Sequence, residues 1–331
     1  MLNSPRVLVT GAAGFVGWHV CAYLARMGRS VRGLVRRESA NLPEGVERTQ
    51  LGDLSDVEGM PMALHGVGAV VHCAARVHVT DEAAADPLAA FRQVNVGGTV
   101  DLLEAASSAG VSQFVFLSSV KAVGEASTQP WDESVLPAPV DPYGISKYEA
   151  EARLMAQPPS SPMAISILRL PLVYGPGVSA NMMRLIRTVD RGVPLPFRGI
   201  DNRRSLAFVG NVCLAVEAVL DRPSGSREVF FVSDDEDVST PGLIKAIAYA
   251  LGRPARLFPM PWLMLRPLAR MGDRISTVVP WPLSTMTLQR LTGSLQVDCG
   301  KLQQHTNYRP RYRLAQGLAS TVTWYRAQRP H

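Results

Sequence analysis

A glycine-rich turn near the start of the chain constrains its fold more than any other feature. An apolar run at residues 7–9 leads into Gly11, Gly14 and Gly17, which are spaced G-x-x-G-x-x-G, and an apolar helical pattern follows through Leu24. A strand, a glycine turn and a helix in this order are typical of a dinucleotide-binding site. The alternative interpretation is a glycine-rich turn that holds no ligand.

Each glycine has a distinct task in such a site. Gly11 permits the tight turn, Gly14 lets a pyrophosphate approach the backbone, and Gly17 lets the helix pack close to the strand. The first turn of the helix offers unpaired N–H groups and the positive end of its dipole to the phosphates. We therefore expect residues 11, 14 and 17, together with Phe15 and Val16, to contact the cofactor.

Apolar runs of the β type alternate with helical patterns through the first half of the chain, at residues 31–35, 46–51, 69–73, 114–117 and 165–170. Residues 87–109 carry the longest of the helical patterns between them. This alternation predicts an α/β fold with a Rossmann-type, doubly wound parallel sheet and right-handed crossovers.

Prolines and glycines punctuate shorter elements after Pro171, which predicts a smaller C-terminal α/β substrate domain. We expect residues 1–175 to form the dinucleotide-binding domain and residues 176–328 the substrate domain. Parts of residues 204–233, namely 204–220 and 228–232, are expected to pack back onto the large sheet.

Composition excludes several other classes of protein. The chain has 331 residues, of which 47% are hydrophobic, and its formal charge of +6 is modest for that length. It has no run of basic residues interleaved with aromatics, so nucleic-acid binding is not expected. The four cysteines are far apart without metal-ligand spacing, which favours reduced thiols in the cytoplasm and no metal site.

No apolar stretch approaches the ~18–20 residues of a membrane-spanning helix, so no integral membrane segment is expected. The most apolar late region, residues 257–283, is broken by five prolines. We interpret it as a proline-broken core segment of the second domain, and contact with a membrane surface is the alternative.

The residues after the second and third predicted strands bear on the choice of cofactor. Arg36 and Arg37 stand near the place where an NAD-preferring strand usually carries an acidic residue for the ribose. Because a guanidinium pairs well with phosphate oxygens, we expect NADP in preference to NAD, although a solvated strand end would also explain the two arginines. Asp53 is expected to accept a hydrogen bond from the adenine amino group, with Leu54 beside it.

Small residues follow the fourth predicted strand. Cys73, Ala74 and Ala75 stand at its end and would leave the backbone bare beside the cofactor. We therefore include all three in the expected cofactor site.

A phenol and an ammonium group lie one helical turn apart, at Tyr143 and Lys147. The pKa of a free phenol is about 10, and a neighbouring positive charge favours the phenolate. Ser119, at the end of the fifth predicted strand, would share the substrate oxygen with Tyr143. Together the three residues predict a proton relay for hydride transfer at a carbinol carbon. The alternative is an exposed helix pair of little consequence.

These motifs resemble those of extended short-chain dehydrogenases/reductases of the UDP-sugar 4-epimerase and 4-ketoreductase group. The resemblance runs nearly end to end, through T-G-x-x-G-F-x-G at residues 10–17, the cofactor-side segment 72–75, N-V-x-G-T at 95–99, Y-x-x-x-K at 143–147 and the joining segment 172–176. It implies a cofactor role for Asn95, a sugar-nucleotide contact for Asn181, a diphosphate contact for Arg204, and a homodimer formed through the two long helices that flank the sheet.

Some positions depart from the pattern of the group. The 4,6-dehydratases carry Asp-Glu after the active-site hydroxyl, where this chain has Val120 and Lys121, so dehydration is not expected. Of the paired arginines that often precede a late Gly-Asp, only Arg290 remains as a displaced candidate for the diphosphate. His78, after the fourth strand, is a candidate substrate contact, against the commoner structural or exposed histidine.

From these residues we expect an enzyme that acts at C4 of a UDP-hexose. The leading hypothesis is NADPH-dependent reduction of a 4-keto-6-deoxy-hexosamine for surface-polysaccharide biosynthesis. The alternative is a UDP-hexose 4-epimerase with tightly bound NAD, and a more remote one is a nucleotide-sensing protein without catalysis.

Overall fold

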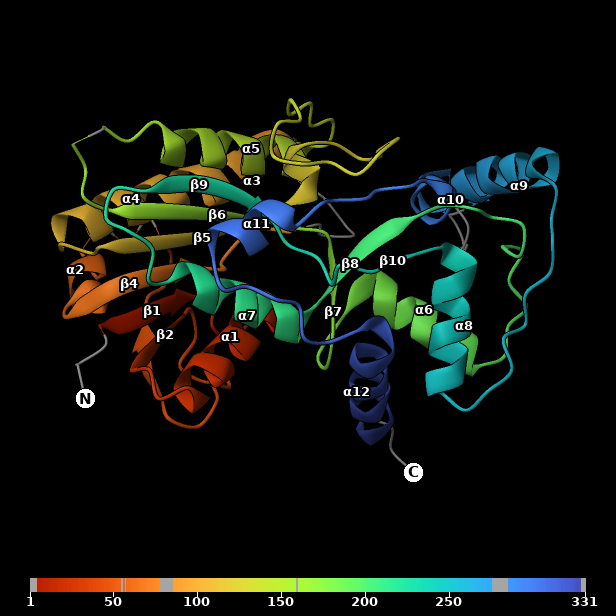
Figure 1. The fold of residues 1–331 in the computed structure, drawn as a ribbon, viewed down its shortest axis with the longest axis horizontal. Helices are drawn as coiled ribbons and strands as arrows, with labels where there is room; N and C mark the ends of the chain where they lie inside the picture. The colour runs from red at the N-terminus through yellow and green to blue at the C-terminus, as the bar shows by residue number, and fades with distance from the viewer. Residues whose placement is uncertain are drawn as a thin grey trace.

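Two lobes lie side by side in the computed structural model, which describes residues 5–54, 56, 58–77, 86–158, 160–275 and 285–328 (Figure 1). The larger lobe is built on a seven-stranded sheet and the smaller one on a three-stranded sheet. Both termini of the described chain emerge on the same side of the molecule in this view.

The seven strands of the large sheet all run parallel. They are β1 (Arg6–Thr10), β2 (Val31–Val35), β3 (Val46–Gln50), β4 (Val67–His72), β5 (Gln113–Ser119), β6 (Ala164–Leu170) and β9 (Arg227–Phe231). Their order in space is β3-β2-β1-β4-β5-β6-β9. The order reverses between β1 and β4, and in open α/β sheets the ligand crevice lies outside the carboxyl ends of the strands at that point. The predicted fold class is confirmed.

Alternating apolar residues in β1 explain why both faces of this sheet are covered. Val7 and Val9 belong to the core beneath α1 (Phe15–Arg26) and α7 (Val209–Val219), whereas Leu8 belongs to the core on the opposite face. Successive side chains of a strand point to opposite faces, so a strand that is apolar throughout requires helices on both sides.

Helices form the layer over the second face of the large sheet (Figure 1). They are α2 (Met60–Leu64), α3 (Pro87–Arg92), α4 (Gly98–Ser108) and α5 (Pro142–Met155). The continuous helix predicted for residues 87–109 is interrupted by a π-helical turn, η1 (Gln93–Gly97), which separates α3 from α4. Asn95 is buried within that turn, and π-helical turns occur frequently at functional sites.

The smaller lobe has its own apolar core, which includes Tyr174, Ile186, Ile244 and Leu318. Its sheet has the order β10-β8-β7. The strands are β7 (Leu172–Tyr174), β8 (Arg204–Phe208) and β10 (Asp237–Val238), and the helices are α6 (Ala180–Asp190), α8 (Thr240–Ala250), α9 (Trp262–Ile275), α10 (Thr285–Thr292) and α12 (Leu314–Ala327).

The segment expected to return to the large sheet divides between the lobes. β9 pairs with β6 at the edge of the large sheet, and α7 packs against α1. β8 instead pairs with β7 and β10 in the small sheet, so the expectation for residues 204–220 is wrong for this strand. The short helix α11 (Gly300–His305), within the range assigned to the substrate domain, packs beside β9.

Within the part of the chain that the structure describes, none of the helices is both long and apolar enough to cross a membrane.

Candidate active site

The glycine turn between β1 and α1 is tight enough to require glycine at two positions. Gly11 has a φ of 64°, and a Cβ on it would lie 2.8 Å from the backbone nitrogen of Ala74. A Cβ on Gly17 would lie 2.2 Å from the Gly11 carbonyl oxygen. The turn therefore demands glycine for its own packing, whether or not a ligand is bound.

The residues around this turn fit a dinucleotide diphosphate. Gly14 is the N-cap residue of α1 and supplies no side-chain cap, so backbone N–H groups of the first helical turn remain for an anion. Phe15 and Val16, at the start of α1, are half-buried, and α1 carries no acidic residue in its first turn. Ala74 donates its backbone N–H to the Thr10 hydroxyl at 3.1 Å, which joins the ends of β1 and β4.

The remaining expected cofactor residues lie after the carboxyl ends of neighbouring strands. Cys73 and Ala75 are half-buried just after β4. Arg36 and Arg37 are exposed after β2, and Asp53 is exposed after β3. Leu54 lies against the first turn of α4, where a Cβ on Gly98 would approach the Leu54 Cβ to 3.1 Å.

The structure brings Ser119, Tyr143 and Lys147 together at the carboxyl end of β5. Ser119 is the last residue of that strand, and its hydroxyl is hydrogen-bonded to the Tyr143 phenol. Tyr143 and Lys147 lie one turn apart on α5. The Lys147 ammonium is buried, donates to the Leu117 carbonyl at 2.7 Å and lies 3.8 Å from the centre of the Phe116 ring.

The electrostatics of this group differ from the sequence-based expectation. Burial raises the pKa of Tyr143 to about 12, and the Asp141 carboxylate adds to the increase while the bond to Ser119 opposes it. Burial also lowers the pKa of Lys147 to about 7, against the attraction of Glu151. The expectation that Lys147 lowers the pKa of the phenol is thus not met here, because Lys147 is itself desolvated and directed at a carbonyl.

A buried ion pair lies one turn beyond Lys147. The Arg169 guanidinium of β6 donates to the Glu151 carboxylate at 2.8 Å, and the Ser118 hydroxyl donates to the same carboxylate at 2.5 Å. Sequence reasoning missed this pair. The available signal was the i, i+4, i+8 spacing of Tyr143, Lys147 and Glu151, which places all three on one helix face.

A second buried network starts from His72 at the end of β4. Its Nδ1 lies 2.6 Å from the Thr10 hydroxyl and its Nε2 lies 3.0 Å from the Thr99 hydroxyl. The Thr99 hydroxyl donates to the Asn95 carbonyl at 2.7 Å, so it accepts from His72, which places the imidazole proton on Nε2. Burial lowers the pKa of His72 to about 3, and the ring is therefore neutral at ordinary pH.

Asn95 connects this network to α5. Its side-chain amide donates to the Arg76 carbonyl at 3.0 Å and to the Ser146 hydroxyl at 2.9 Å, and its oxygen accepts from the Arg76 N–H at 2.7 Å. The Ser146 hydroxyl donates in turn to the Tyr143 carbonyl at 2.8 Å. Asn95 therefore fixes the segment that follows β4 relative to the first turn of α5.

The segment after Ser119 is fixed to the start of α5 by charged groups. Lys121, in the 3-10 turn η2 (Val120–Ala122), pairs with Asp141 and lies 2.8 Å from the Glu125 carboxylate. Asp141 caps α5 by accepting from the Gly144 N–H at 2.5 Å. A Cβ on Gly144 would lie 2.3 Å from the Lys121 carbonyl oxygen, so the two segments pack at backbone distance.

The structure brings only some of the predicted substrate residues close to one another. Arg204 is the first residue of β8, and its guanidinium donates to the backbone carbonyls of Arg290 and Gly293 at 2.9 and 3.0 Å. Arg204 and Arg290 therefore meet, with Arg204 bound to the backbone of the α10 end. Asn181 is exposed at the start of α6. His78 lies outside the described residues.

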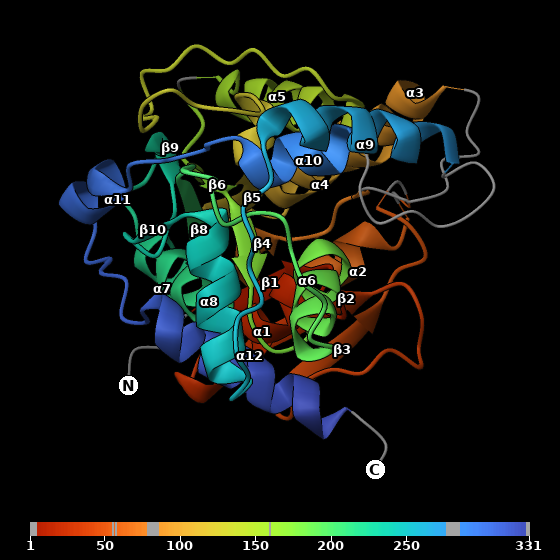
Figure 2. The same cartoon turned by 90° about the vertical axis from the view of Figure 1, so that its right-hand side faces the viewer.

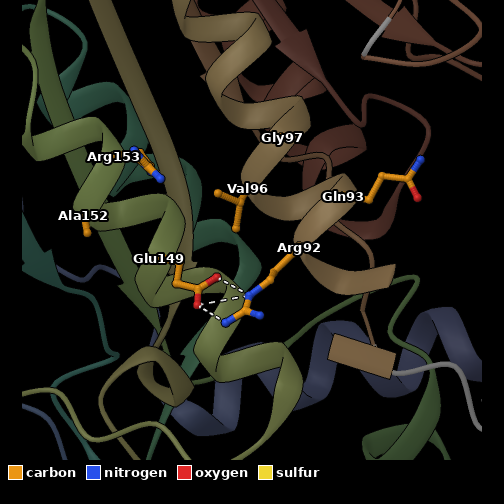
Figure 3. Close-up of a pocket in the computed structure, with 7 residues that line it drawn as sticks. All are labelled: Arg92, Gln93, Val96, Gly97, Glu149, Ala152 and Arg153. Carbon is orange, nitrogen blue, oxygen red and sulfur yellow. Dashed lines mark hydrogen bonds and ion pairs between the residues drawn. The ribbon is translucent and has the colours of Figure 1, made fainter. Parts of the chain in front are cut away.

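A hollow of about 670 Å³ lies elsewhere, on the outer side of the helical layer (Figure 3). It is lined by residues of α3, η1 and α5, among which Arg92 and Glu149 form an ion pair of 2.6 Å. None of its lining residues is a predicted site residue. The candidate active site is therefore defined by the strand ends and α5 rather than by this hollow.

Comparison with known families decides the class of this site. The family model "NAD dependent epimerase/dehydratase family" matches residues 7–232, which include the glycine turn, Ser119, Tyr143 and Lys147. The chain belongs to this family.

Two relatives that are similar to nearly the whole chain are named as 4-epimerases. A UDP-glucose 4-epimerase of Vibrio cholerae is 36% identical over 96% of this chain and 94% of its own length. An N-acetyl-alpha-D-glucosaminyl-diphospho-ditrans,octacis-undecaprenol 4-epimerase of Escherichia coli O157:H7 is 28% identical over 97% of this chain and 95% of its own. Both span nearly the whole of this family member.

A solved structure is similar to nearly the whole chain. MoeE5 in complex with UDP-glucuronic acid and NAD is 26% identical, with a TM-score of 0.76, over 97% of this chain and 99% of its own. This family member is therefore an NAD-dependent short-chain dehydrogenase/reductase of the nucleotide-sugar epimerase/dehydratase type. The resemblance inferred from the sequence is confirmed at this level.

Proposed function

We propose that this protein is a UDP-hexose 4-epimerase that oxidises C4 of its substrate and reduces it again on the opposite face. The observation that carries the proposal is the hydrogen-bonded pair of Ser119 and Tyr143 at the carboxyl end of β5. The glycine turn that fits a dinucleotide follows β1 of the same parallel sheet, at the same edge. The names of the relatives support 4-epimerisation over other reactions of the family.

Each catalytic residue has a task that its chemistry permits. When bound, NAD would supply the hydride exchange at C4, and its oxidised ring would bring a positive charge to the site. A positive charge beside a buried phenol favours the phenolate, so Tyr143 can accept the proton of the C4 hydroxyl and later return it. Ser119 hydrogen-bonds the same oxygen, and Lys147, whose pKa is lowered to about 7, adds a positive charge one turn along α5 when it is protonated.

Reduction of a UDP-linked 4-keto sugar is the second candidate, with an exchangeable cofactor. Arg36 and Arg37 favour it, because they are exposed at the end of β2 and suit the 2′-phosphate of NADP. The NADP preference stays a prediction, since the similar MoeE5 structure contains NAD. Dehydration is disfavoured in both cases, because Val120 and Lys121 offer no carboxylate next to Ser119.

The experiment that separates the two candidates is mass spectrometry of the nucleotide that co-purifies, followed by incubation with UDP-sugars without added cofactor. We expect bound NAD and interconversion of C4 epimers. A protein that emerges without nucleotide and oxidises NADPH only when a UDP-4-keto sugar is added would replace epimerisation with reduction. A protein inactive in both assays would overturn both candidates.

We also propose a homodimer formed through α4 and α5, the two long helices on one face of the sheet. The hollow of Figure 3, bordered by Arg92 and Glu149, lies beside α5 and the η1 turn that precedes α4. Sedimentation equilibrium would give the mass, and a monomer at micromolar concentration would contradict this proposal.

A further inference from the structure

An apolar face of α9 is exposed on the smaller lobe. Leu263 is 86% exposed, Met264 59% and Met271 45%, whereas Leu265 is fully buried in the core of that lobe. Met264, Pro267 and Met271 follow one another at helical spacing, so they form a stripe, and Leu263 lies beside it. The helix thus has an inner contact through Leu265 and an outer surface that is also apolar.

An apolar side chain shortly before the helix is exposed as well. Phe258, four residues before α9, is 38% exposed, and its carbonyl accepts a hydrogen bond from the Arg198 N–H at 3.2 Å. Helices of globular proteins usually turn apolar residues inward, and a contiguous exposed apolar surface marks an interaction site. The proline-broken segment is therefore only partly the core segment that its sequence predicts.

The charge around this face is strongly positive. Residues 253–275 contain five arginines and one aspartate, in a chain whose formal net charge is +6, although Arg253 is ion-paired with Asp190. Arg266 and Arg270 are exposed on α9 beside the apolar stripe, and Arg198 is exposed next to Phe258. A helix with exposed leucine and methionine on one side and arginines alongside has the composition of an interfacial amphipathic helix.

The position of α9 suits contact with a flat surface. Figures 1 and 2 both place α9 beside α10 at the outer edge of the smaller lobe, and the two helices pack together. α9 has 14 residues, too few to span a bilayer, so it would lie in the plane of the surface.

We propose that α9 docks this protein on the surface of an anionic phospholipid bilayer. Leu263, Met264 and Met271 enter the boundary between headgroups and acyl chains, and the arginines contact anionic headgroups. A bilayer is favoured over a protein partner or a second copy of the chain because the apolar residues are accompanied by like charges. Two such surfaces facing each other would repel, whereas an anionic membrane is complementary to both features.

This docking would bring the candidate diphosphate residue near the membrane. The Arg204 guanidinium binds the carbonyls of Arg290 and Gly293 at the end of α10, and α10 packs on α9. Only one helix therefore separates Arg204 from the docking helix. The inference itself does not depend on the proposed C4 chemistry, because it concerns a surface rather than the active site.

Vesicle co-sedimentation of the full-length protein tests the proposal. We expect binding to vesicles of phosphatidylglycerol mixed with phosphatidylcholine at least about tenfold tighter than to phosphatidylcholine alone. The double variant Leu263→Ser/Met264→Ser, and separately Arg266→Glu/Arg270→Glu, should each lower binding to the anionic vesicles about tenfold or more. Thermal unfolding of each variant checks that it folds.

Tyr249→Ser is the matched control, since Tyr249 is 87% exposed on α8 of the same lobe and should leave vesicle binding unchanged. Equal binding by wild type, control and α9 variants would overturn the proposal, as would no binding of the wild type to anionic vesicles. Self-association that depends on Leu263 in the absence of vesicles would assign the surface to a second copy instead.

Discussion

The Arg169 guanidinium of β6 and the Glu151 carboxylate of α5 form an ion pair of 2.8 Å, and their side chains are only 6% and 3% exposed. Tyr143, Lys147 and Glu151 lie on successive turns of α5, so this pair fixes the helix face that also carries the candidate catalytic groups. The negative charge of Glu151 also favours the protonated form of the buried Lys147.

The first prediction concerns this pair. Glu151→Gln should lower the free energy of unfolding by about 3–5 kcal/mol, because it leaves the Arg169 charge buried without its partner. Urea unfolding followed by circular dichroism gives the value. Glu149→Gln is the matched control, since Glu149 lies on the same helix as Glu151 but pairs with the exposed Arg92 of α3, and its loss should change stability very little. Equal losses in the two variants would refute the structural role of the buried pair.

The second prediction concerns the phenol. Tyr143→Phe should lower kcat about 10²–10⁴-fold while nucleotide binding is retained, because only the proton transfer is lost. Turnover of UDP-sugars and the amount of bound nucleotide are the two measurements. Tyr148→Phe is the control: Tyr148 lies five residues further along α5 and is 37% exposed, so its loss should leave kcat nearly unchanged. A loss below tenfold in Tyr143→Phe would remove this residue from the acid-base role.

The third prediction concerns acid stability. The pKa of His72 is lowered to about 3 in the folded protein, against 6.5 for an ordinary histidine, so the unfolded chain binds more protons between these values. The free energy of unfolding should therefore fall as pH is lowered through this window, with His72 contributing about 2 kcal/mol between pH 7 and pH 5.

His72→Gln tests this contribution, because glutamine can hydrogen-bond Thr10 or Thr99 but does not titrate. We expect the variant to be less stable at pH 7 and to show a shallower loss of stability toward pH 5 in urea unfolding. An unchanged pH slope would mean that other groups control acid stability.

The fourth prediction concerns the cofactor. If Arg36 binds a 2′-phosphate, Arg36→Asp should lower the affinity for NADP relative to NAD at least about tenfold, through the loss of one charge-assisted pairing. Fluorescence titration with both dinucleotides measures the ratio. Lys245→Asp, an exposed change of the same charge on α8, should leave it unaltered. A constant ratio in Arg36→Asp would identify Arg36 as a solvated strand end.

Local patterns predicted much of the large lobe. The strand, glycine turn and helix around Gly11 follow from residues adjacent in sequence, and the close approach at Gly17 is imposed by the Gly11 carbonyl only six residues away. The i, i+4 spacing likewise predicted that Tyr143 and Lys147 share a helix face. What it did not predict was the pKa of the phenol, which depends on burial by other segments.

Other features depend on partners distant in the chain. The division of residues 204–233 between two sheets was not predicted, because it depends on the pairing partners of β8 and β9, which lie in different sheets. The cofactor role expected for Asn95 stays a prediction, but the bonds of its amide to Arg76 and Ser146 were not predicted. A side chain with several donors reveals its partners only when the elements around it are assembled.

The sequence alone therefore determined the doubly wound sheet, the glycine turn and the order of Ser119, Tyr143 and Lys147, since periodicity and short-range sterics act along the chain. Only the tertiary structure decided the ionisation of the active-site groups, the buried pair of Glu151 and Arg169, and the exposure of the α9 stripe. These properties depend on desolvation and on contacts between segments far apart in the chain, which spacing along the sequence does not contain.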